Sequence, residues 1–478
     1  MTLWDFQENN VNKAIDFYDH GGRSLVIQQP TGTGKSLVAR EIVNRFYTSN
    51  KPVYFITHSK NLLWQFSDHL VDIGLRHGII APNHPIIRYK IQVISVQSLK
   101  KRMKMLDEPA LLIFEECHHS PSKIFRDILD FWTHSNLLGI TATPNRPDGT
   151  PLGDIYEELI LSPQVKWFIE NYYLSDYEYF APEELDTSGI HHRYGDFVKS
   201  EILEAVDKKA IIGNLVDHYN RFAPGLPGII SSVSIKHSED IATQFLERGI
   251  NTQAIHSKMK GDVKTIIGKL KAGGVDLISF CDMLGEGVSV NGLSALIMGR
   301  PTDSLTIDLQ QIGRILRAVY AKGHDLSTKD GRHAAMEEGG KGKAIIIDPV
   351  NNYIRHGLPD DDRTWTLEGK TKTDKGTITL KRCPECLRPV NIGVRICPFC
   401  EFVWPETTVD RIPEEKAGQL VNVRDRGEKQ DLVLAIGRGA HNLKEAIKIA
   451  KRQGLKHTEA YDVWTRILKN EVHEVVKF

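Results

Sequence analysis

Short apolar runs alternate with longer amphipathic stretches over the first 350 residues of the chain. Runs of four or five residues rich in Val, Ile, Leu and Phe predict β-strands, and apolar residues at helical spacing between them predict helices. Such alternation is typical of a parallel sheet covered by helices. We therefore expect an α/β fold with two parallel-sheet lobes that meet near residue 165. The expected strands are 24–28, 53–57, 92–96, 111–114 and 137–141 in the first lobe, and 228–232, 252–255, 277–280, 295–298 and 344–347 in the second.

Three other regions have different patterns. Residues 320–343 are polar, charged and rich in glycine, which is typical of a mobile surface insertion. Residues 366–382 are rich in Lys and Thr and are expected to form a linker. From about residue 430, apolar residues return at helical spacing and predict a small helical module. The predicted domains are therefore 1–164, 165–365, 366–410 and 411–478.

The composition is that of an ordinary globular protein of two to four domains, with 478 residues, 41% hydrophobic and 26% charged. Basic and acidic residues balance at 61 each, so the net charge gives no sign of a polyanionic partner. This balance does not exclude a local basic groove on the surface. Because the sequence has neither a signal-peptide pattern nor 18 uninterrupted apolar residues, we expect a cytoplasmic protein with no membrane partner.

A glycine-rich segment, Gln-Gln-Pro-Thr-Gly-Thr-Gly-Lys-Ser over 28–36, lies between a predicted strand and a predicted helix. Its glycines let backbone amides point at phosphate oxygens, and the following helix presents its positive end to the same anion. Lys35 would neutralise the β/γ-phosphates and Ser36 would bind Mg²⁺. Gln29 stands where the full pattern has Gly. The segment predicts a nucleoside triphosphate site, with the candidate binding residues Thr31, Gly32, Thr33, Gly34, Lys35 and Ser36.

Two acidic residues, Glu115 and Glu116, follow the apolar run 111–114. An apolar strand that ends in two acids after a phosphate loop is typical of the second half of an NTPase site. Glu115 would hold Mg²⁺ through water, and Glu116 would orient and activate the attacking water.

The phosphate loop and the acidic pair follow one another along the chain in the order found in one known family. On these segments, residues 1–365 resemble a superfamily 2 helicase of the DExH type. The resemblance implies two tandem RecA-like domains that hydrolyse ATP between them. Glu115 stands where the family usually has Asp, a departure that bears on the catalytic rate. The segments that carry the resemblance are 3–7, 29–36, 57–65, 95–98, 115–118, 141–144 with its continuation 145–149, 229–237, 282–288 and 310–317.

The resemblance assigns further residues to the ATP site. Gln7 would bond the adenine edge, and Gly285 and Gly287 lie in the segment similar to motif V. Gln310 opens the segment similar to motif VI. Two arginines three positions apart share a helix face, so Arg314 and Arg317 could both reach the γ-phosphate as arginine fingers.

The resemblance also assigns coupling and nucleic-acid residues. His118, Thr141 and Thr143 would link the ATP site to the nucleic-acid groove and to the second lobe. For His237, ordinary packing is the alternative to a nucleic-acid contact. The candidate nucleic-acid contacts are Thr57, His58, Ser59, Gln97, Ser98, Arg146 and His237.

Two Cys-x-x-Cys pairs separated by ten residues lie in the region 383–400. Four thiolates complete a closed tetrahedral zinc site, which is structural and not catalytic. The flanking lysines fit a nucleic-acid contact, and a purely architectural role stays open. The predicted Zn²⁺ ligands are Cys383, Cys386, Cys397 and Cys400.

We therefore predict an ATP-dependent DNA helicase or translocase that remodels forks and junctions, similar to compact phage helicases of the branch-migration type. Its partners would be single-stranded and branched DNA, with RNA possible. Three alternatives stay open: an RNA-duplex helicase, an ATP-gated nucleic-acid clamp that does not unwind, and the motor subunit of a restriction complex.

Overall fold

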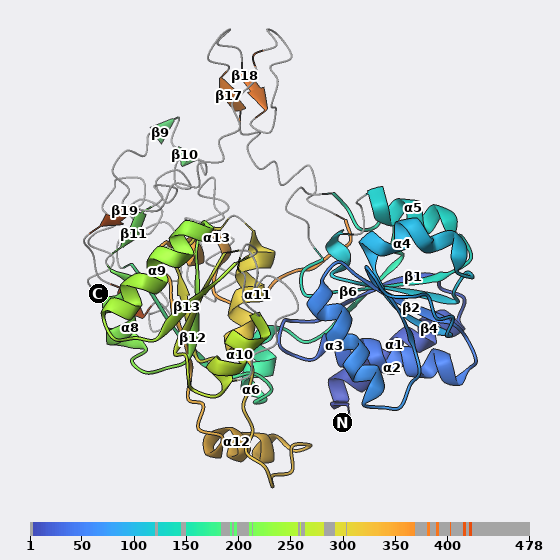
Figure 1. The fold of residues 1–478 in the computed structure, drawn as a ribbon, viewed down its shortest axis with the longest axis horizontal. Coiled ribbons are helices and arrows are strands. Elements are labelled where there is room, and N and C mark those ends of the chain that lie inside the picture. The colour runs from blue at the N-terminus through green and yellow to red at the C-terminus, as the bar shows by residue number, and fades with distance from the viewer. Residues whose placement is uncertain are drawn as a thin grey trace.

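The protein is described by a computed structural model with two α/β lobes (Figure 1). The described residues are 3–119, 123–144, 150–182, 192–193, 196–197, 210–212, 214–256, 259, 263–281, 292–302, 304–368, 380–382, 389–391, 402, 414–416 and 420–422.

The first lobe contains a seven-stranded sheet in the order β3-β4-β2-β5-β6-β1-β7, with every pair parallel. The strands β1, β2, β4 and β5 are buried at every position, as expected for a sheet with helices on both faces. The strand bounds are β1 Ser24–Gln28, β2 Val53–Thr57, β3 Gly78–Ile80, β4 Ile91–Ser95, β5 Leu111–Glu115, β6 Asn136–Thr141 and β7 Glu158–Leu161.

Helices α1 (Asp5–Asp19), α2 (Lys35–Thr48) and α3 (Lys60–Val71) cover one face of this sheet, and α4 (Val96–Arg102) and α5 (Lys123–Phe131) cover the other (Figure 1). Their apolar residues form two separate cores against the two faces of the sheet. Two short 3-10 turns, η1 Met103–Met105 and η2 Cys117–His119, complete the lobe.

The second lobe contains another seven-stranded sheet, in the order β13-β14-β12-β15-β16-β8-β20. Only the edge strand β20 is antiparallel to its neighbour among the pairs of this sheet. The bounds of its elements are α6 Val165–Glu170, β8 Tyr177–Pro182, α8 Leu215–Phe222, β12 Gly228–Ser231, α9 Ile235–Glu247, β13 Thr252–Ile255, α10 Val263–Lys271, β14 Leu277–Phe280, β15 Ala295–Met298, α11 Leu305–Ile315, α12 Lys329–Glu338, β16 Ala344–Ile347, α13 Asn352–His356 and β20 Leu420–Asn422.

All ten predicted strands are present, with bounds that differ from the prediction by one residue at most. The prediction of two parallel-sheet lobes is confirmed. The strands β3, β7, β8 and β20 were not predicted, although β8 buries Tyr177 and Tyr179 with the alternation of a half-buried strand.

The predicted helical module over 411–478 is wrong at residues 420–422, because β20 pairs with β8 as an edge strand of the second sheet. Residues 423–478 lie outside the described part of the chain. Three strand pairs stand apart from the two sheets: β9 (His192–Arg193) with β10 (Asp196–Phe197), β11 (Ala210–Ile212) with β19 (Glu414–Lys416), and β17 (Leu380–Arg382) with β18 (Pro389–Asn391).

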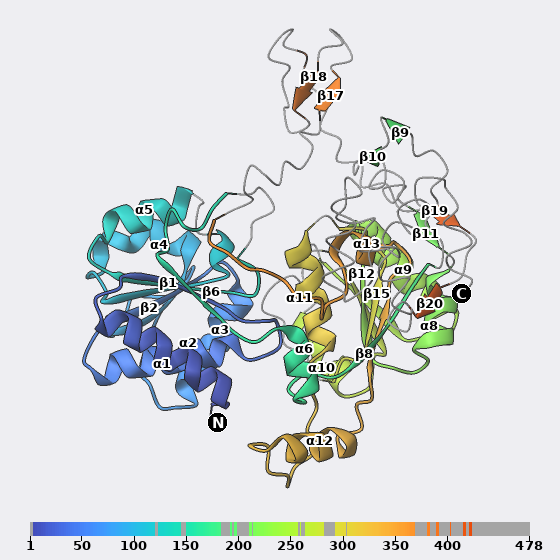
Figure 2. The same ribbon diagram turned by 180° about the vertical axis from the view of Figure 1, so that it is seen from behind.

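Within the described residues, the chain crosses between the lobes before α6 and again after α13 (Figure 2). The two crossings contact each other, since the Gln164 side chain donates a 2.8 Å hydrogen bond to the Arg363 carbonyl. The second crossing then reaches the first lobe, where the Leu367 carbonyl accepts from the amides of Leu152 and Gly153, each at 2.8 Å. The lobes are therefore held together at both crossings. Among the described residues, no helix has the length and apolarity to cross a membrane.

Candidate active site

The segment 29–34 forms a tight loop between β1 and α2, at the carboxyl end of the first sheet. Gly32 and Gly34 have φ angles of 90° and 87°, a left-handed conformation that favours glycine. A Cβ atom on Gly34 would lie 2.4 Å from the Gln7 amide nitrogen. The predicted phosphate loop therefore has the backbone geometry that its glycines require.

Gln29, which departs from the full loop pattern, braces this loop. Its side chain is fully buried and donates to the Thr33 carbonyl at 2.9 Å and the Thr33 hydroxyl at 3.0 Å. The Gln7 side chain donates to the same carbonyl at 2.9 Å. Two side-chain amides thus fix the backbone of the loop just before Lys35.

The two acids lie at the end of β5, in the same sheet. Glu115 is the last residue of the strand, and Glu116 follows with a φ of 52°. A non-glycine residue in this left-handed region costs about 1–3 kcal/mol and is characteristic of functional sites. Both carboxylates are buried. The turn therefore holds two acids side by side at the edge of the sheet that carries the phosphate loop.

The surroundings of Glu116 favour its charged form. Its Oε2 atom lies 3.3 Å from both His118 Nδ1 and the Thr141 hydroxyl. Burial by itself would raise the pKa of Glu116, but the hydrogen bond to His118 and the charge of Lys35 outweigh burial and lower that pKa to about 2. Glu116 is therefore ionised at neutral pH.

Lys35 lies within the field of four charged side chains. Burial lowers the pKa of the Lys35 ammonium, Glu116 and Glu115 act in the opposite direction, and Arg317 and Arg314 lower the pKa further. The fold therefore brings together the five charged residues that the sequence predicted for the ATP site: Lys35, Glu115, Glu116, Arg314 and Arg317.

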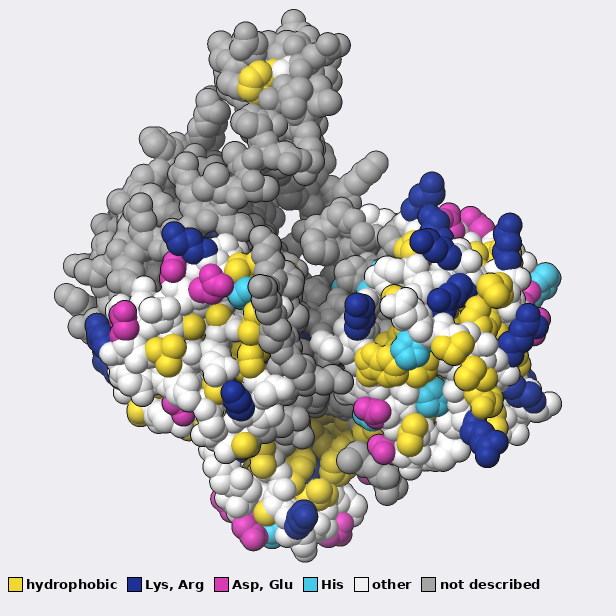
Figure 3. Space-filling model, viewed as in Figure 1, with side chains coloured by type: hydrophobic (Ala, Val, Ile, Leu, Met, Phe, Trp, Pro, Cys, Tyr) yellow, Lys and Arg dark blue, Asp and Glu magenta, His cyan; other side chains and the backbone are white. Residues whose placement is uncertain are grey.

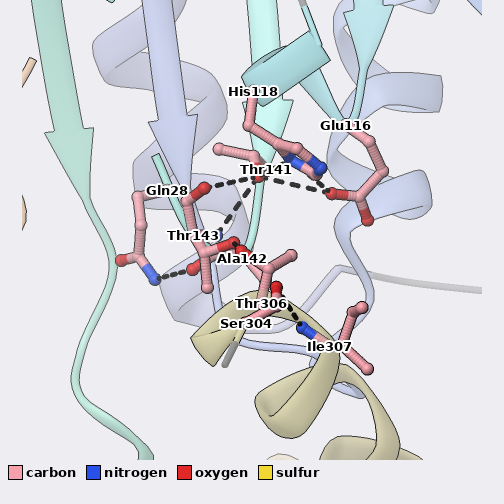
Figure 4. Close-up of polar contacts among 9 residues, drawn as sticks. All are labelled: Gln28, Glu116, His118, Thr141, Ala142, Thr143, Ser304, Thr306 and Ile307. Atoms are coloured by element: carbon pink, nitrogen blue, oxygen red, sulfur yellow. Dashed lines mark hydrogen bonds and ion pairs between the residues drawn. The ribbon is translucent and has the colours of Figure 1, made fainter. Parts of the chain in front are cut away.

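Polar contacts continue from Glu116 into the second lobe (Figure 4). The Thr141 hydroxyl lies 3.1 Å from His118 Nδ1 and accepts from the Thr143 amide at 3.2 Å. The Thr143 hydroxyl lies 2.8 Å from the hydroxyl of Thr306, in the first turn of α11. These contacts form a relay of hydrogen bonds from the acidic pair to the helix that carries Arg314.

One of the two predicted arginine fingers lies in its helix as expected, and the other does not. Arg314 lies in α11 and is buried. The expectation that Arg317 shares a helix face with Arg314 is wrong, because α11 ends at Ile315 and Arg317 forms an antiparallel bridge with Leu174. The charge of Arg317 still acts on Lys35, where it lowers the pKa of the ammonium.

Sequence reasoning assigned no role to three residues of this site: Gln29, which it noted only as a departure from the loop pattern, Thr306 and Gly313. A Cβ on Gly313 would lie 2.5 Å from Thr31 Cβ, so the phosphate loop and α11 approach this closely only with glycine here. A glycine inside a predicted helix was the available signal for Gly313. Nothing in the local sequence pattern distinguishes Thr306.

Family models match both lobes of the chain. Residues 1–146 match "Type III restriction enzyme, res subunit", and residues 208–319 match "Helicase conserved C-terminal domain". The 51.5 kDa protein of Lactococcus phage (isolate 7-9) is 30% identical over 380 residues, which are 78% of this chain and 77% of that protein. The chain belongs to superfamily 2 of the helicases. It is therefore an ATP-hydrolysing helicase.

Other relatives fit this assignment. The probable helicase D10 of Escherichia phage T5 is 24% identical over 313 residues, 64% of this chain and 68% of D10. The helicase spans only 50% of another relative, the IRC3 protein of Saccharomyces cerevisiae. In fold it resembles the ATP-dependent Type ISP restriction-modification enzyme LlaBIII bound to DNA, with a TM-score of 0.51 and 14% identity over 76% of this chain and 33% of that one.

Some predicted nucleic-acid contacts of the helicase lie at the surface of the first lobe. Gln97 is exposed in α4, and His58 is half-buried at the end of β2. The exposed Lys100 and Lys101 follow in α4. Figure 3 shows Lys and Arg side chains distributed over this lobe, between acidic and apolar ones. The lobe therefore offers exposed cations beside Gln97.

Other predicted contacts have local structural roles. Thr57 and Ser98 are buried, and the Ser59 hydroxyl caps α3 by accepting from the Leu62 amide. His237 is buried in α9, where its Nδ1 accepts from the Val233 amide at 3.3 Å. These contacts fit the packing alternative for His237, and its nucleic-acid contact stays a prediction. Arg146, Gly285, Gly287 and the four cysteines lie outside the described residues.

Proposed function

We propose that the helicase is a DNA translocase that remodels forks and junctions, driven by ATP hydrolysis between its lobes. The observation that carries this proposal is the relay from Glu116 through His118, Thr141 and Thr143 to Thr306. A change at the acidic pair can be transmitted along this relay to the second lobe, as a motor requires.

We assign the residues of the ATP site as follows. Gln7 contacts adenine, the phosphate loop and Lys35 hold the phosphates, and Glu116 takes a proton from the attacking water. Ser36 and Glu115 offer oxygen ligands, the type that Mg²⁺ prefers, and both lie beside the loop. When bound, Mg²⁺ would neutralise charge on the transferring phosphoryl group. Arg314 and Arg317 stabilise charge on the same group from the second lobe.

Movement along the nucleic acid would follow because the phosphate loop lies on the first lobe and the two arginines lie on the second. With ATP between the lobes, Arg314 is attracted toward the γ-phosphate and α11 stays against the phosphate loop at Gly313. After hydrolysis that attraction falls and the lobes can part. If each lobe grips the strand mainly through its phosphates, this cycle moves the protein along the backbone in a way that tolerates sequence and weakens with salt.

The preference for DNA over RNA rests on resemblance. The segment 145–149 resembles DNA-remodelling members of the family, and Gln310 stands where RNA helicases of the DEAD-box type have His. The preference for branched DNA rests on similarity to phage branch-migration enzymes. An RNA-duplex helicase is the second candidate. An ATP-gated clamp without unwinding is the third, since Glu115 departs from the usual Asp.

We also propose a structural Zn²⁺ held by Cys383, Cys386, Cys397 and Cys400. Strands β17 and β18 pair antiparallel, with Arg382 opposite Pro389. The chain between these paired residues contains both cysteines of the first Cys-x-x-Cys pair. A hairpin that brackets two thiol ligands is consistent with a zinc ribbon.

The proposed function is tested by steady-state ATP hydrolysis without nucleic acid and with single-stranded DNA, forked DNA, a four-way junction and matched RNA. We expect the largest stimulation with the forked DNA and the junction. Stimulation by RNA alone would favour the second candidate, and no stimulation would favour the clamp. Lys35→Ala is the control, and it should abolish hydrolysis under every condition.

A further inference from the structure

The segment 320–343 lies between α11 and β16 and contains α12, which projects from the second lobe (Figures 1 and 2). Its composition predicted a mobile surface insertion, but two of its cations are buried. Arg332 is 4% exposed and Lys341 is 9% exposed. Fully buried Arg and Lys side chains are rare unless they are paired. The contacts of these two cations therefore show what the insertion holds in place.

Arg332 ties α12 to the segment that follows α6. Its Nε donates to the Asn171 carbonyl at 2.9 Å, and its guanidinium carbon lies 4.0 Å from the centre of the Tyr173 ring. The same guanidinium lies 5.8 Å from the ring of Trp4, which contacts Tyr173 edge-on at 5.1 Å. A cation over aromatic rings in a desolvated site is a stabilising contact. Arg332 therefore fixes both rings.

Trp4 connects this contact to the phosphate loop. Its backbone amide donates to the Gln7 side-chain oxygen at 3.0 Å, and the Gln7 nitrogen donates to the Thr33 carbonyl at 2.9 Å. Phe6 lies between Trp4 and Gln7 in sequence and belongs to the apolar core of the second lobe. The insertion thus reaches the adenine-reading segment through Trp4.

Lys341 acts at the other end of the ATP site. Its ammonium donates to the carbonyls of Ile315, at 2.5 Å, and Arg317. The last carbonyls of a helix have no partner within the helix, and a cation is favourable at this negative end. Because α11 ends at Ile315, Lys341 fixes the backbone at the point where the chain leaves the helix and turns to Arg317.

We propose that the insertion 320–343 positions the ATP site at both ends, with Lys341 holding the arginine pair and Arg332 holding the adenine-reading segment. Both are positioning residues, since their described contacts are to other side chains and to the backbone. The inference rests on the proposed roles of Arg314, Arg317 and Gln7. The two residues are expected to affect different kinetic constants: loss of Lys341 lowers kcat, and loss of Arg332 raises KM for ATP.

The test measures kcat and KM for ATP in the full chain, with the nucleic acid that stimulates hydrolysis most. We expect Lys341→Met to lower kcat at least tenfold with KM within twofold of the parent. We expect Arg332→Met to raise KM at least fivefold with kcat within twofold. Lys341→Arg should recover part of kcat, because it keeps a charged donor. The matched control is Lys343→Met, whose side chain is 54% exposed beside Asp176, and both constants should stay unchanged.

An unchanged kcat in Lys341→Met, or equal changes of both constants in the two variants, would overturn the inference. If Lys341→Met does not fold, Lys341→Gln replaces it with the same thresholds, since Gln keeps a donor without the charge. Arg314→Ala is measured beside them. If Arg314→Ala leaves kcat unchanged, the proposed role of the arginines fails. If it lowers kcat and the Lys341 variants do not, only the positioning inference fails.

Discussion

The hydroxyls of Thr143 and Thr306 lie 2.8 Å apart and join the two lobes beside the ATP site. Both side chains are buried. Thr143 belongs to the loop after β6 and follows Thr141, whose hydroxyl contacts Glu116, by two residues. Thr306 lies in the first turn of α11, the helix that carries Arg314. One direct hydrogen bond thus connects the hydrolytic site to α11.

Thr306→Val should weaken the coupling between the lobes. A single substitution leaves the Thr143 hydroxyl buried without this partner, which costs about 1–3 kcal/mol. If 1 kcal/mol of that cost is added to the activation barrier, the rate falls about fivefold. We expect nucleic-acid-stimulated kcat to fall about fivefold or more in Thr306→Val and in Thr143→Val, with no further fall in the double variant. Additive losses in this double-mutant cycle would show that the two residues act independently.

Glu116→Gln should bind ATP and not hydrolyse it. The amide keeps the shape of the side chain but removes the proton acceptor, and general bases contribute roughly 10²–10⁴-fold. We expect kcat to fall by that factor while the equilibrium affinity for ATP stays within a few-fold. Because the pKa of Glu116 is about 2, this residue should not produce an acid limb in the rate profile above pH 4. Turnover close to that of the parent would remove Glu116 from its proposed role.

Gln29→Gly restores the usual loop pattern and should still be harmful. It removes both hydrogen bonds to Thr33 in a buried site, at a cost of about 1–3 kcal/mol, and adds backbone freedom. We expect a lower thermal unfolding midpoint and a higher KM for ATP. Gln29→Met keeps most of the volume without the amide and should lose stability for the same reason. A Gly variant as stable as the parent would show that the amide does not brace the loop.

The stability of the second lobe should fall as pH rises, because of Asp308 in α11. Burial and the charge of Asp348 raise the pKa of Asp308 to about 8, whereas its ordinary value is 3.8. Between these values the folded state holds a proton that the unfolded state has released, so the free energy of unfolding decreases with pH, by at most about 1.4 kcal/mol per unit.

Asp308→Asn mimics the protonated form and should flatten this dependence. The measurement is urea unfolding at pH 5, 6, 7 and 8 for the parent, Asp308→Asn and the control Asp217→Asn, whose side chain is 67% exposed. The control should retain the slope of the parent. Equal slopes in all three proteins would contradict the assignment to Asp308.

Purified protein should contain one zinc ion per chain, which is lost in Cys397→Ser. A closed site of four thiolates needs every ligand, so removal of one thiol should weaken retention strongly. Metal content by mass spectrometry gives the result. Cys281→Ser, at a buried cysteine of the second lobe, is the control and should keep its zinc. Folded protein without metal would exclude the ribbon.

Much of the architecture could be predicted because it depends on local patterns. Apolar runs of four or five residues gave ten strands, since a strand buried on both faces needs apolar side chains throughout. The phosphate loop was predictable for a similar reason: the left-handed backbone at Gly32 and Gly34 requires glycine at fixed spacing. The edge strands β3, β7 and β20 were missed, because three or four residues carry too little periodicity.

The sequence by itself determined the identities of Lys35, Glu115, Glu116 and Arg314 and their order along the chain. Only the tertiary structure decided how they meet. Four sets of contacts join residues that are distant in sequence or that no pattern singles out. They are the close approach at Gly313, the hydrogen bond between Thr143 and Thr306, the brace from Gln29, and the contacts of the buried Arg332 and Lys341. Such contacts depend on how side chains pack within each lobe and between the lobes, and local periodicity does not encode that packing.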